Sequence, residues 1–390
     1  MNFTDQEALI QKNAGNRIRQ VRRAKKISST KLAFLAGISQ GYISKIENGK
    51  AALQISVLSR LSQILERPVE YFLKSSNEQP RIIGSLITVA GPESQAINWL
   101  AQEISRLTDK RLMFIPLQSS QLGSGSDQIQ QLLNGEIDLF IEDLSRFHQL
   151  CPDFDIFSLP YVFDNETHLK SFINENYFHK IMLKSLHDSG IIFVNPNWNW
   201  RRGVEWVLVA KRPIPDPEGI RGLRVRVHDS KVQAAFWKEL GAVPVSIPWV
   251  ETKDAMQAGK IDVLPTHKSH VYPLKFCDLF KHVTLLGDLS PVLGIAINNS
   301  VYQLLLPDIQ NSVAEACYNG GEYFSKVIRE AEEINQALNM EQLNATYTQG
   351  NIFKWRQAAS QAGKSLKRSG LLCSDIFEAI AKSSINQSGC

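Results

Sequence analysis

The pattern of hydrophobic residues along the chain changes near residue 80. Before it, apolar side chains recur at helical spacing in short blocks. These residues include Leu32, Leu35, Ile43 and Ile46. After it, short apolar runs such as 86–90 and 111–116 alternate with amphipathic stretches, which predicts strands alternating with helices. The chain is therefore expected to be multidomain, with an all-α bundle followed by an α/β domain whose sheets are largely parallel.

The first unit has the pattern of a helix-turn-helix. Gly37 ends a helix predicted over 30–36, and Ser39 is suited to cap the next helix, Gln40–Glu47. Asn48-Gly49 then supplies residues that tolerate the left-handed conformation at a helix end. Two short helices joined by a tight glycine turn are typical of DNA-binding modules.

Three phrases in this unit resemble the λ-repressor-like, Xre/Cro-type family over residues 13–74. They are Asn16-Arg-Ile-Arg, Leu32-Ala-Phe-Leu-Ala-Gly-Ile-Ser and Ile43-Ser-Lys-Ile-Glu-Asn-Gly-Lys. The resemblance implies that the helix 40–47 enters the major groove of double-stranded DNA. It implies base-facing positions at Gln40, Gly41, Tyr42 and Lys45, a position near the backbone at Ser44, and phosphate contacts at Arg17, Arg22 and Lys50. The alternative is a solvated basic helix without a nucleic-acid role.

A polar stretch ending in Pro80 separates the two units, and we expect residues 75–83 to form a linker. Charge divides at the same place. Residues 1–80 carry 13 basic and 6 acidic side chains, whereas the remainder carries 30 basic and 33 acidic ones. A basic first unit on a mildly acidic second unit suits contact of the first with phosphate.

The second unit resembles the solute receptors of TRAP transporters, the DctP-type family. The resemblance is carried by the order of several phrases: Gln121-Leu-Gly-Ser, Leu132-Leu-Asn-Gly-Glu-Ile-Asp-Leu, Leu159-Pro-Tyr-Val-Phe-Asp, Gly222-Leu-Arg-Val-Arg-Val, Leu240-Gly-Ala-Val-Pro-Val and Ala255-Met-Gln-Ala-Gly-Lys-Ile-Asp. It implies a two-lobed, periplasmic-binding-protein-like (type II) domain over 84–385. One lobe is expected at about 84–202 and 288–335, and the other at about 203–287 and 336–385. A long helix, 307–338, is expected to span both.

The resemblance also implies an acid-binding cleft between the lobes. Arg226 is the position at which the family holds a ligand carboxylate, and a guanidinium matches that group with two parallel hydrogen bonds. Arg224, on the same strand face, is the alternative anchor for the carboxylate. Arg226 could also have no role in binding and pair with a neighbouring Asp or Glu. The other candidate ligand-binding residues are Thr266, Glu205, Arg202, Trp200 and His267. Glu205 departs from the family, which often has arginine there. His267 and His270 have a spacing found in metal sites, but no third ligand accompanies them.

These features together predict a cytoplasmic, ligand-responsive transcription regulator. It would bind operator DNA as a homodimer and sense a small organic acid, a carboxylate or a sulfonate. The alternative is a TRAP-type receptor for organic-acid uptake with a non-functional head. No enzymatic activity, cofactor or metal is expected. Residues Met1–Ala14 do not have the pattern of a secretory signal, and no apolar run is long enough to span a membrane, so no contact with a membrane is expected.

Overall fold

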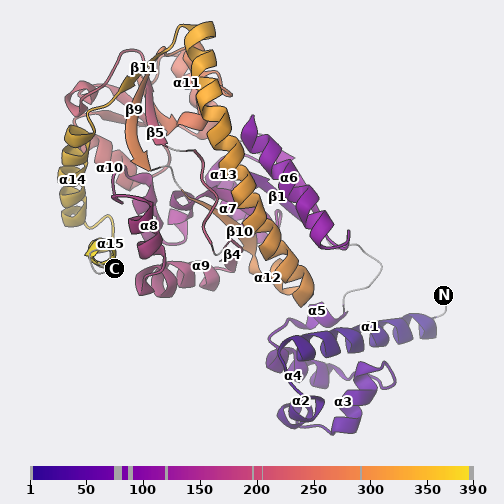
Figure 1. The fold of residues 1–390 in the computed structure, drawn as a ribbon. Helices are drawn as coiled ribbons and strands as arrows, with labels where there is room; N and C mark the ends of the chain where they lie inside the picture. The colour runs from indigo at the N-terminus through magenta and orange to yellow at the C-terminus, as the bar shows by residue number, and fades with distance from the viewer. Residues whose placement is uncertain are drawn as a thin grey trace.

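The computed structural model describes residues 3–73, 81–86, 91–118, 122–195, 197–203, 205–289 and 292–385. Its first unit, which we call the head, is the expected helical bundle (Figure 1). The helices are α1 (Phe3–Ala24), α2 (Ser29–Ala36), α3 (Gln40–Glu47), α4 (Ile55–Leu65) and α5 (Val69–Leu73). The Ser39 hydroxyl accepts from the Tyr42 N–H to cap α3, and Gly37 ends α2 in the left-handed region. The helix-turn-helix prediction is thus confirmed at its turn.

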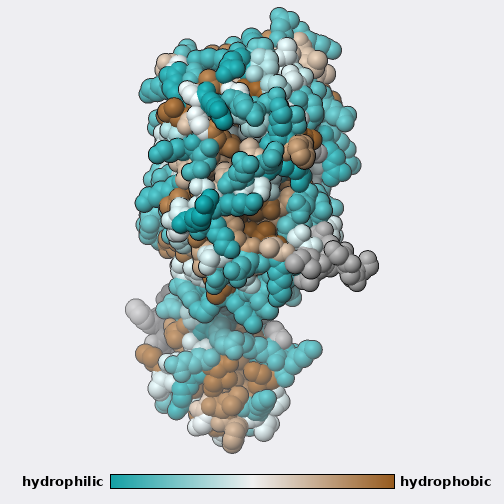
Figure 2. Space-filling model, turned by 90° about the vertical axis from the view of Figure 1, so that its left-hand side faces the viewer, coloured by the Kyte–Doolittle hydropathy of each residue, from teal (hydrophilic) through white to brown (hydrophobic). Residues whose placement is uncertain are grey.

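Leu35, one of the apolar residues at helical spacing in the head, lies at the surface. Leu32 is buried, but Leu35 is 49% exposed, because α2 buries Ala33 and Ala36 beside Leu32 instead. Phe34 and Ile55 are also exposed, and Figure 2 shows hydrophobic residues gathered on the head.

The second unit, which we call the body, contains two sheets, each the centre of one lobe. The first sheet has the order β2 (Met113–Gln118), β1 (Arg81–Leu86), β3 (Leu139–Asp143), β10 (Leu293–Asn298) and β4 (Ile191–Phe193). The second has the order β11 (Thr346–Gln349), β9 (His282–Leu289), β5 (Glu205–Ala210), β8 (Val263–His267), β6 (Arg224–Val227) and β7 (Val243–Ser246). The sheets are mixed, because β10 and β5 run antiparallel to their neighbours. The prediction of largely parallel sheets is therefore wrong for β10 and β5.

The body begins earlier than its sequence suggested. Arg81 is the first residue of β1 and pairs with Met113 of β2, so 81–83 belong to the sheet and not to the linker. Residues 74–80, which make up most of the expected linker, lie outside the described residues, as do 87–90 of the strand expected at 86–90.

Helices cover both sheets and tie the lobes together. They are α6 (Pro92–Leu107), α7 (Gly125–Asn134), α8 (Glu166–Ile173), α9 (Lys184–Asp188), α10 (Lys231–Glu239), α11 (Thr252–Gln257), α12 (Asn299–Gln303), α13 (Pro307–Leu343), α14 (Ile352–Ser369) and α15 (Ser374–Ile385). The long helix α13 packs on α6 of the first lobe, as Figure 1 shows, and reaches the turns 268–270 and 276–278 of the second lobe. The expected lobe-spanning helix is therefore confirmed, five residues longer than predicted.

The head rests on the first lobe where α13 begins. The Arg67 guanidinium donates to the Gln310 side-chain oxygen at 2.9 Å, and Leu304 and Leu306 pack against the hydrophobic core of the head. Figure 1 shows α5 next to this end of α13. Among the described residues, no helix is long and apolar enough to cross a membrane.

Candidate functional site

A cleft between the lobes is lined by the ends of strands from both sheets. From the first lobe come Glu142 and Asp143 at the end of β3 and Arg146 in the turn after it; from the second come Arg226, Thr266 and His267. The inner part leaves about 30 Å³ for the centres of water molecules, room for about two of them. An adjoining part of about 280 Å³ shares Arg146, Arg226, His228 and Trp249 with it.

Arg226 lies in this cleft, and none of the described carboxylates forms an ion pair with it. It is 5% exposed, its Nε donates to the Ile247 carbonyl at 2.9 Å, and its guanidinium lies 5.4 Å from the Trp249 ring centroid. Its Nη2 has no hydrogen-bond partner within the described part of the chain. Burial, and next the positive charge of Arg146, lower the pKa of Arg226 to about 9. A buried cation with an unsatisfied N–H is a site that an anion would stabilise.

Arg224, the alternative on the same strand, is already paired. Its guanidinium donates to both Asp262 carboxylate oxygens at 2.8 Å. These hydrogen bonds are the main cause of the low pKa of Asp262. The ion pair with an acidic residue that was considered for Arg226 is thus formed by Arg224 instead. Arg224 does not line the cleft.

Arg202 lies in the cleft wall at the centre of a buried ionic cluster. It bonds Glu93 at 2.9 Å, also donates to Glu142, and lies 3.3 Å from an Asp143 oxygen. Burial raises the pKa of Glu142, whereas at Asp143 the effect of burial is outweighed by Arg202 and His267, which lower that pKa. The Nη2 of Arg202 is unpaired among the described atoms. Arg202 therefore retains one N–H donor for a ligand, while the carboxylates of the cluster balance its positive charge.

The histidines of the H-x-x-H segment join the same cluster. His270 Nε2 is 2.9 Å from Glu93, and His267 Nε2 is 3.4 Å from Asp143. Burial lowers the pKa of His267 to about 4, so its ring is neutral near pH 7. Thr266 lies within 3.4 Å of His270 Nδ1 and lines the cleft. These two histidines are therefore engaged with carboxylates on the first lobe.

Two predicted ligand-binding residues lie elsewhere. Trp200 is fully buried against α13, where its indole N–H donates to the Cys317 carbonyl, and does not line either part of the cleft. Glu205 accepts from the Gly287 N–H at 2.9 Å and lies 3.9 Å from Lys268 Nζ. Both expectations are wrong on this geometry, because each side chain is committed to neighbours outside the cleft.

The sequence did not single out Arg146, Trp249 or His228, which line both parts of the cleft. Arg146 follows β3 by three residues, and its Nε is unpaired among the described residues. The position of Arg146 and His228 just after a strand could have identified them as ligand-binding candidates, because ligand sites often lie at the ends of strands. Trp249 lies in a short turn after β7, with no spacing to mark it.

The head presents the outer surface of α3. Gln40, Gly41 and Lys45 are exposed, and Lys50 follows in the exposed turn. Tyr42 and Ser44 are half-buried, and the Tyr42 hydroxyl donates to the Ala52 carbonyl at 2.8 Å. The base-facing positions thus lie on one helix, with Tyr42 also bracing the loop behind it.

The two arginines expected at phosphate are held inside the head. Arg22 bonds the buried Glu47 at 2.8 Å and the Ile27 carbonyl at 2.9 Å. Arg17 donates to the Tyr71 carbonyl at 2.5 Å. Both contacts tie α1 to other helices of the bundle, a structural role that the sequence alone did not reveal.

Comparison with known proteins agrees with both units. Residues 84–368 match the family model of the bacterial extracellular solute-binding proteins, family 7, and residues 18–72 match a helix-turn-helix model. The C4-dicarboxylate-binding periplasmic protein DctP of Rhodobacter capsulatus is 26% identical over 55% of this chain and 63% of its own length. The 2,3-diketo-L-gulonate-binding periplasmic protein YiaO of Escherichia coli is 23% identical over 62% of this chain and 71% of its own.

Solved structures share the fold of the body. A TRAP periplasmic solute-binding protein from Sulfitobacter sp. NAS-14.1 with bound β-D-galacturonate gives a TM-score of 0.69 at 18% identity, over 77% of this chain and 98% of its own. One from Shewanella oneidensis with bound succinate gives 0.69 at 19%, over 78% and 99%. The chain thus belongs to the bacterial extracellular solute-binding proteins of family 7, and it joins that domain to an Xre-like helix-turn-helix domain.

Proposed function

We propose that this protein is a cytoplasmic transcription regulator that binds operator DNA through α3 and senses a small organic acid in the interlobe cleft. One observation carries the proposal: a buried, carboxylate-free Arg226 lies in the cleft of a chain whose head exposes a recognition helix. The relatives named for C4-dicarboxylate binding and the structures with galacturonate and succinate support a carboxylate as the effector. A sulfonate offers the same fork of oxygen acceptors.

Closure of the lobes supplies the signal in this proposal. The inner part of the cleft is too small for an acid of this kind, so the acid would occupy the adjoining part of about 280 Å³ beside Arg226, and closure of the lobes would enclose it there. The head rests on the first lobe through Arg67 and Gln310, so closure moves the second lobe relative to the head. In a homodimer whose heads meet half-sites about 34 Å apart, such a movement changes their spacing.

DNA selection with the full-length chain tests this function. Genomic fragments are selected on the protein and sequenced, and affinity for the enriched site is then measured with and without acids such as succinate and galacturonate. A coupling of about 1–3 kcal/mol changes operator affinity by about 5–150-fold, in either direction. Equal affinity for all fragments would contradict a role in operator recognition.

The second candidate is an uptake receptor whose head does not bind DNA. The periplasmic names of the relatives favour it. Cell fractionation separates the two candidates, because a receptor would be recovered in the periplasm and a regulator with the cytoplasm and its DNA.

A further inference from the structure

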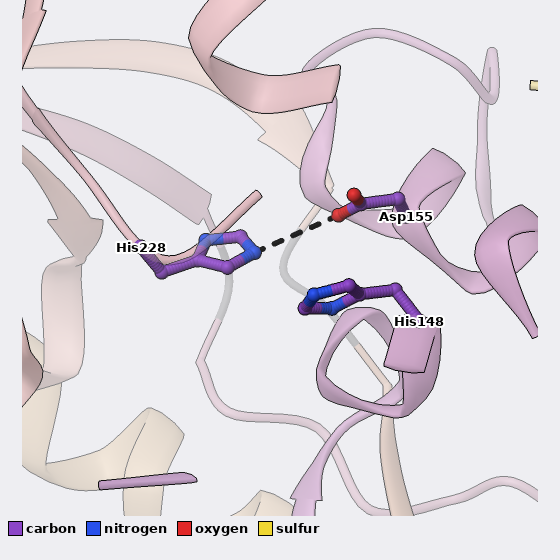
Figure 3. A group of neighbouring side chains, drawn as sticks. All are labelled: His148, Asp155 and His228. Atoms are coloured by element: carbon purple, nitrogen blue, oxygen red, sulfur yellow. Dashed lines mark ion pairs between the residues drawn. The ribbon is translucent and has the colours of Figure 1, made fainter. Parts of the chain in front are cut away.

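The interlobe cleft contains a group of side chains to which the proposed function assigns no role; His228 lines both parts of the cleft, and His148 lines the adjoining part. His148 and Asp155 come from the turns 144–149 and 152–158, which follow β3 of the first lobe, and His228 follows β6 of the second. One potential ligand atom from each lies within 4.8 Å of the others. Figure 3 shows His228 pointing toward Asp155, with His148 beside them. The three residues therefore meet only across the interface between the lobes.

The hydrogen bonds around this group leave its ligand atoms unsatisfied. His228 Nε2 lies 3.6 Å from Asp155 Oδ1, too far for a good hydrogen bond, and neither atom has a partner among the described residues. Both side chains are more than nine-tenths buried. The other Asp155 oxygen accepts from Ser230 at 2.7 Å, which fixes the carboxylate. A buried imidazole nitrogen and a buried carboxylate oxygen that face each other at this distance without other partners are expected to share a cation or a proton.

We propose that His148, Asp155 and His228 bind a Zn²⁺ ion, or a similar first-row transition-metal dication, that bridges the two lobes. Two imidazoles and one carboxylate form a donor set that suits Zn²⁺, whereas Ca²⁺ and Mg²⁺ take oxygen ligands. With metal–ligand bonds of about 2.0–2.2 Å, tetrahedral ligand atoms lie about 3.3–3.6 Å apart. The His228–Asp155 separation fits, and a small rotation of the half-buried His148 completes the set.

The hydrogen bond behind His148 agrees with this assignment. His148 Nδ1 lies 2.9 Å from the Ser145 carbonyl, so that nitrogen carries the proton and Nε2 keeps its lone pair for a metal. Arg146 opposes a nearby dication, and the single charge of Asp155 offsets it.

The site has a consequence for the moving parts of the body. A metal held by residues of both lobes stabilises the closed arrangement, and its binding needs neither DNA nor an organic acid. The proposal therefore stands or falls separately from the proposed function. Three protein ligands also leave a fourth position for water or for an oxygen of a bound molecule.

Titration of the full-length, chelator-treated protein with Zn²⁺ against a chromogenic chelator tests the site. The wild type should bind one equivalent that His148→Ala and Asp155→Asn bind at least about 100-fold more weakly. His187→Ala removes an exposed histidine on α9 and should behave as the wild type. Zn²⁺ should also raise the melting temperature of the wild type and of His187→Ala, but not of His148→Ala.

A loss of Zn²⁺ binding can be distinguished from a loss of folding. His148 is half-buried, so its replacement is the least disruptive, and circular dichroism melting of the metal-free proteins checks the fold. Zn²⁺ taken up by the exposed Cys373 is the same in all variants and cancels in the comparison. If His148→Ala and Asp155→Asn bind Zn²⁺ as the wild type does, the site is overturned.

Discussion

Arg224 and Arg226 lie two residues apart on β6, yet their surroundings differ. Arg224 is neutralised by Asp262, whereas the Nη2 of Arg226 has no partner among the described residues and the positive charge of Arg146 lies near it. A strand places both side chains on one face, so the spacing alone did not choose between them. The choice depends on Asp262, which lies 38 residues beyond Arg224 and directly before β8, and which only the folded sheet brings beside Arg224.

The first prediction concerns this pair. Arg226→Ala should abolish the thermal stabilisation that an organic acid confers, because the carboxylate loses its buried guanidinium. Arg224→Ala removes the same charge from the same strand and should keep the stabilisation. Differential scanning fluorimetry with a panel of carboxylic and sulfonic acids makes the comparison. Stabilisation that persists in Arg226→Ala would place the anion elsewhere, with Arg146 or Arg202 as the next residues to change.

The second prediction concerns Asp288 on β9. Burial raises its pKa to about 7, against an ordinary value of 3.8, while the Tyr161 N–H donates to its carboxylate. The folded state thus holds this proton to a higher pH than the unfolded state, so stability falls as pH rises from about 4 to about 7. Asp288→Asn should lessen that fall, since each unit of pKa difference is worth about 1.4 kcal/mol. Chemical denaturation at about pH 5 and pH 8 measures it; parallel curves for both proteins would contradict the prediction.

At the scale of elements, the helix-turn-helix followed from local signals. Ser39 and Gly37 act within a few residues of their own positions, so their roles were predictable. Leu35 and Arg22 were misplaced because their environment is set by packing between helices. The rotation of α2 in the bundle exposes Leu35, and Glu47 on α3 captures Arg22 of α1.

The same limit applies to the cleft. Arg226 and Thr266 were predictable because a family phrase marks their strands, and both line the cleft. Trp200 and Glu205 were not, since their neighbours Cys317 and Gly287 come from distant segments. His148, Asp155 and His228 carry no joint spacing in the sequence, and only the meeting of two lobes brings them together.

The third prediction concerns α3. Replacing Gln40 and Lys45 together by Ala should remove operator preference, because both side chains are exposed on α3, would face the base edges in the proposed complex, and each good base contact is worth about 1–3 kcal/mol. Arg60→Ala removes an exposed charge from α4 and should retain the preference. Fluorescence anisotropy against the selected operator and a scrambled duplex compares them. Undiminished preference in the double variant would show that another surface reads the DNA.

At the scale of the whole molecule, the head and the first lobe form a continuous structure. Gln310 accepts from Arg67 of the head and donates through its amide nitrogen to the Tyr302 carbonyl at 2.6 Å, while Leu304 and Leu306 touch the core of the head. These contacts gather where α12 passes into α13, the helix that also reaches the second lobe. A change in lobe position therefore has a packed route to the head.

The fourth prediction tests that route. Arg67→Ala combined with Leu306→Ala should leave both acid-induced stabilisation and operator binding intact, because neither residue lies in the cleft or on α3. The effect of acid on operator affinity should shrink, since the head then moves independently of α13. Anisotropy titrations with and without a stabilising acid measure the ratio of the two affinities. Gln303→Ala, on neighbouring α12 but without a hydrogen bond to the head, should keep the wild-type ratio. If the double variant also keeps it, the signal does not pass through this contact.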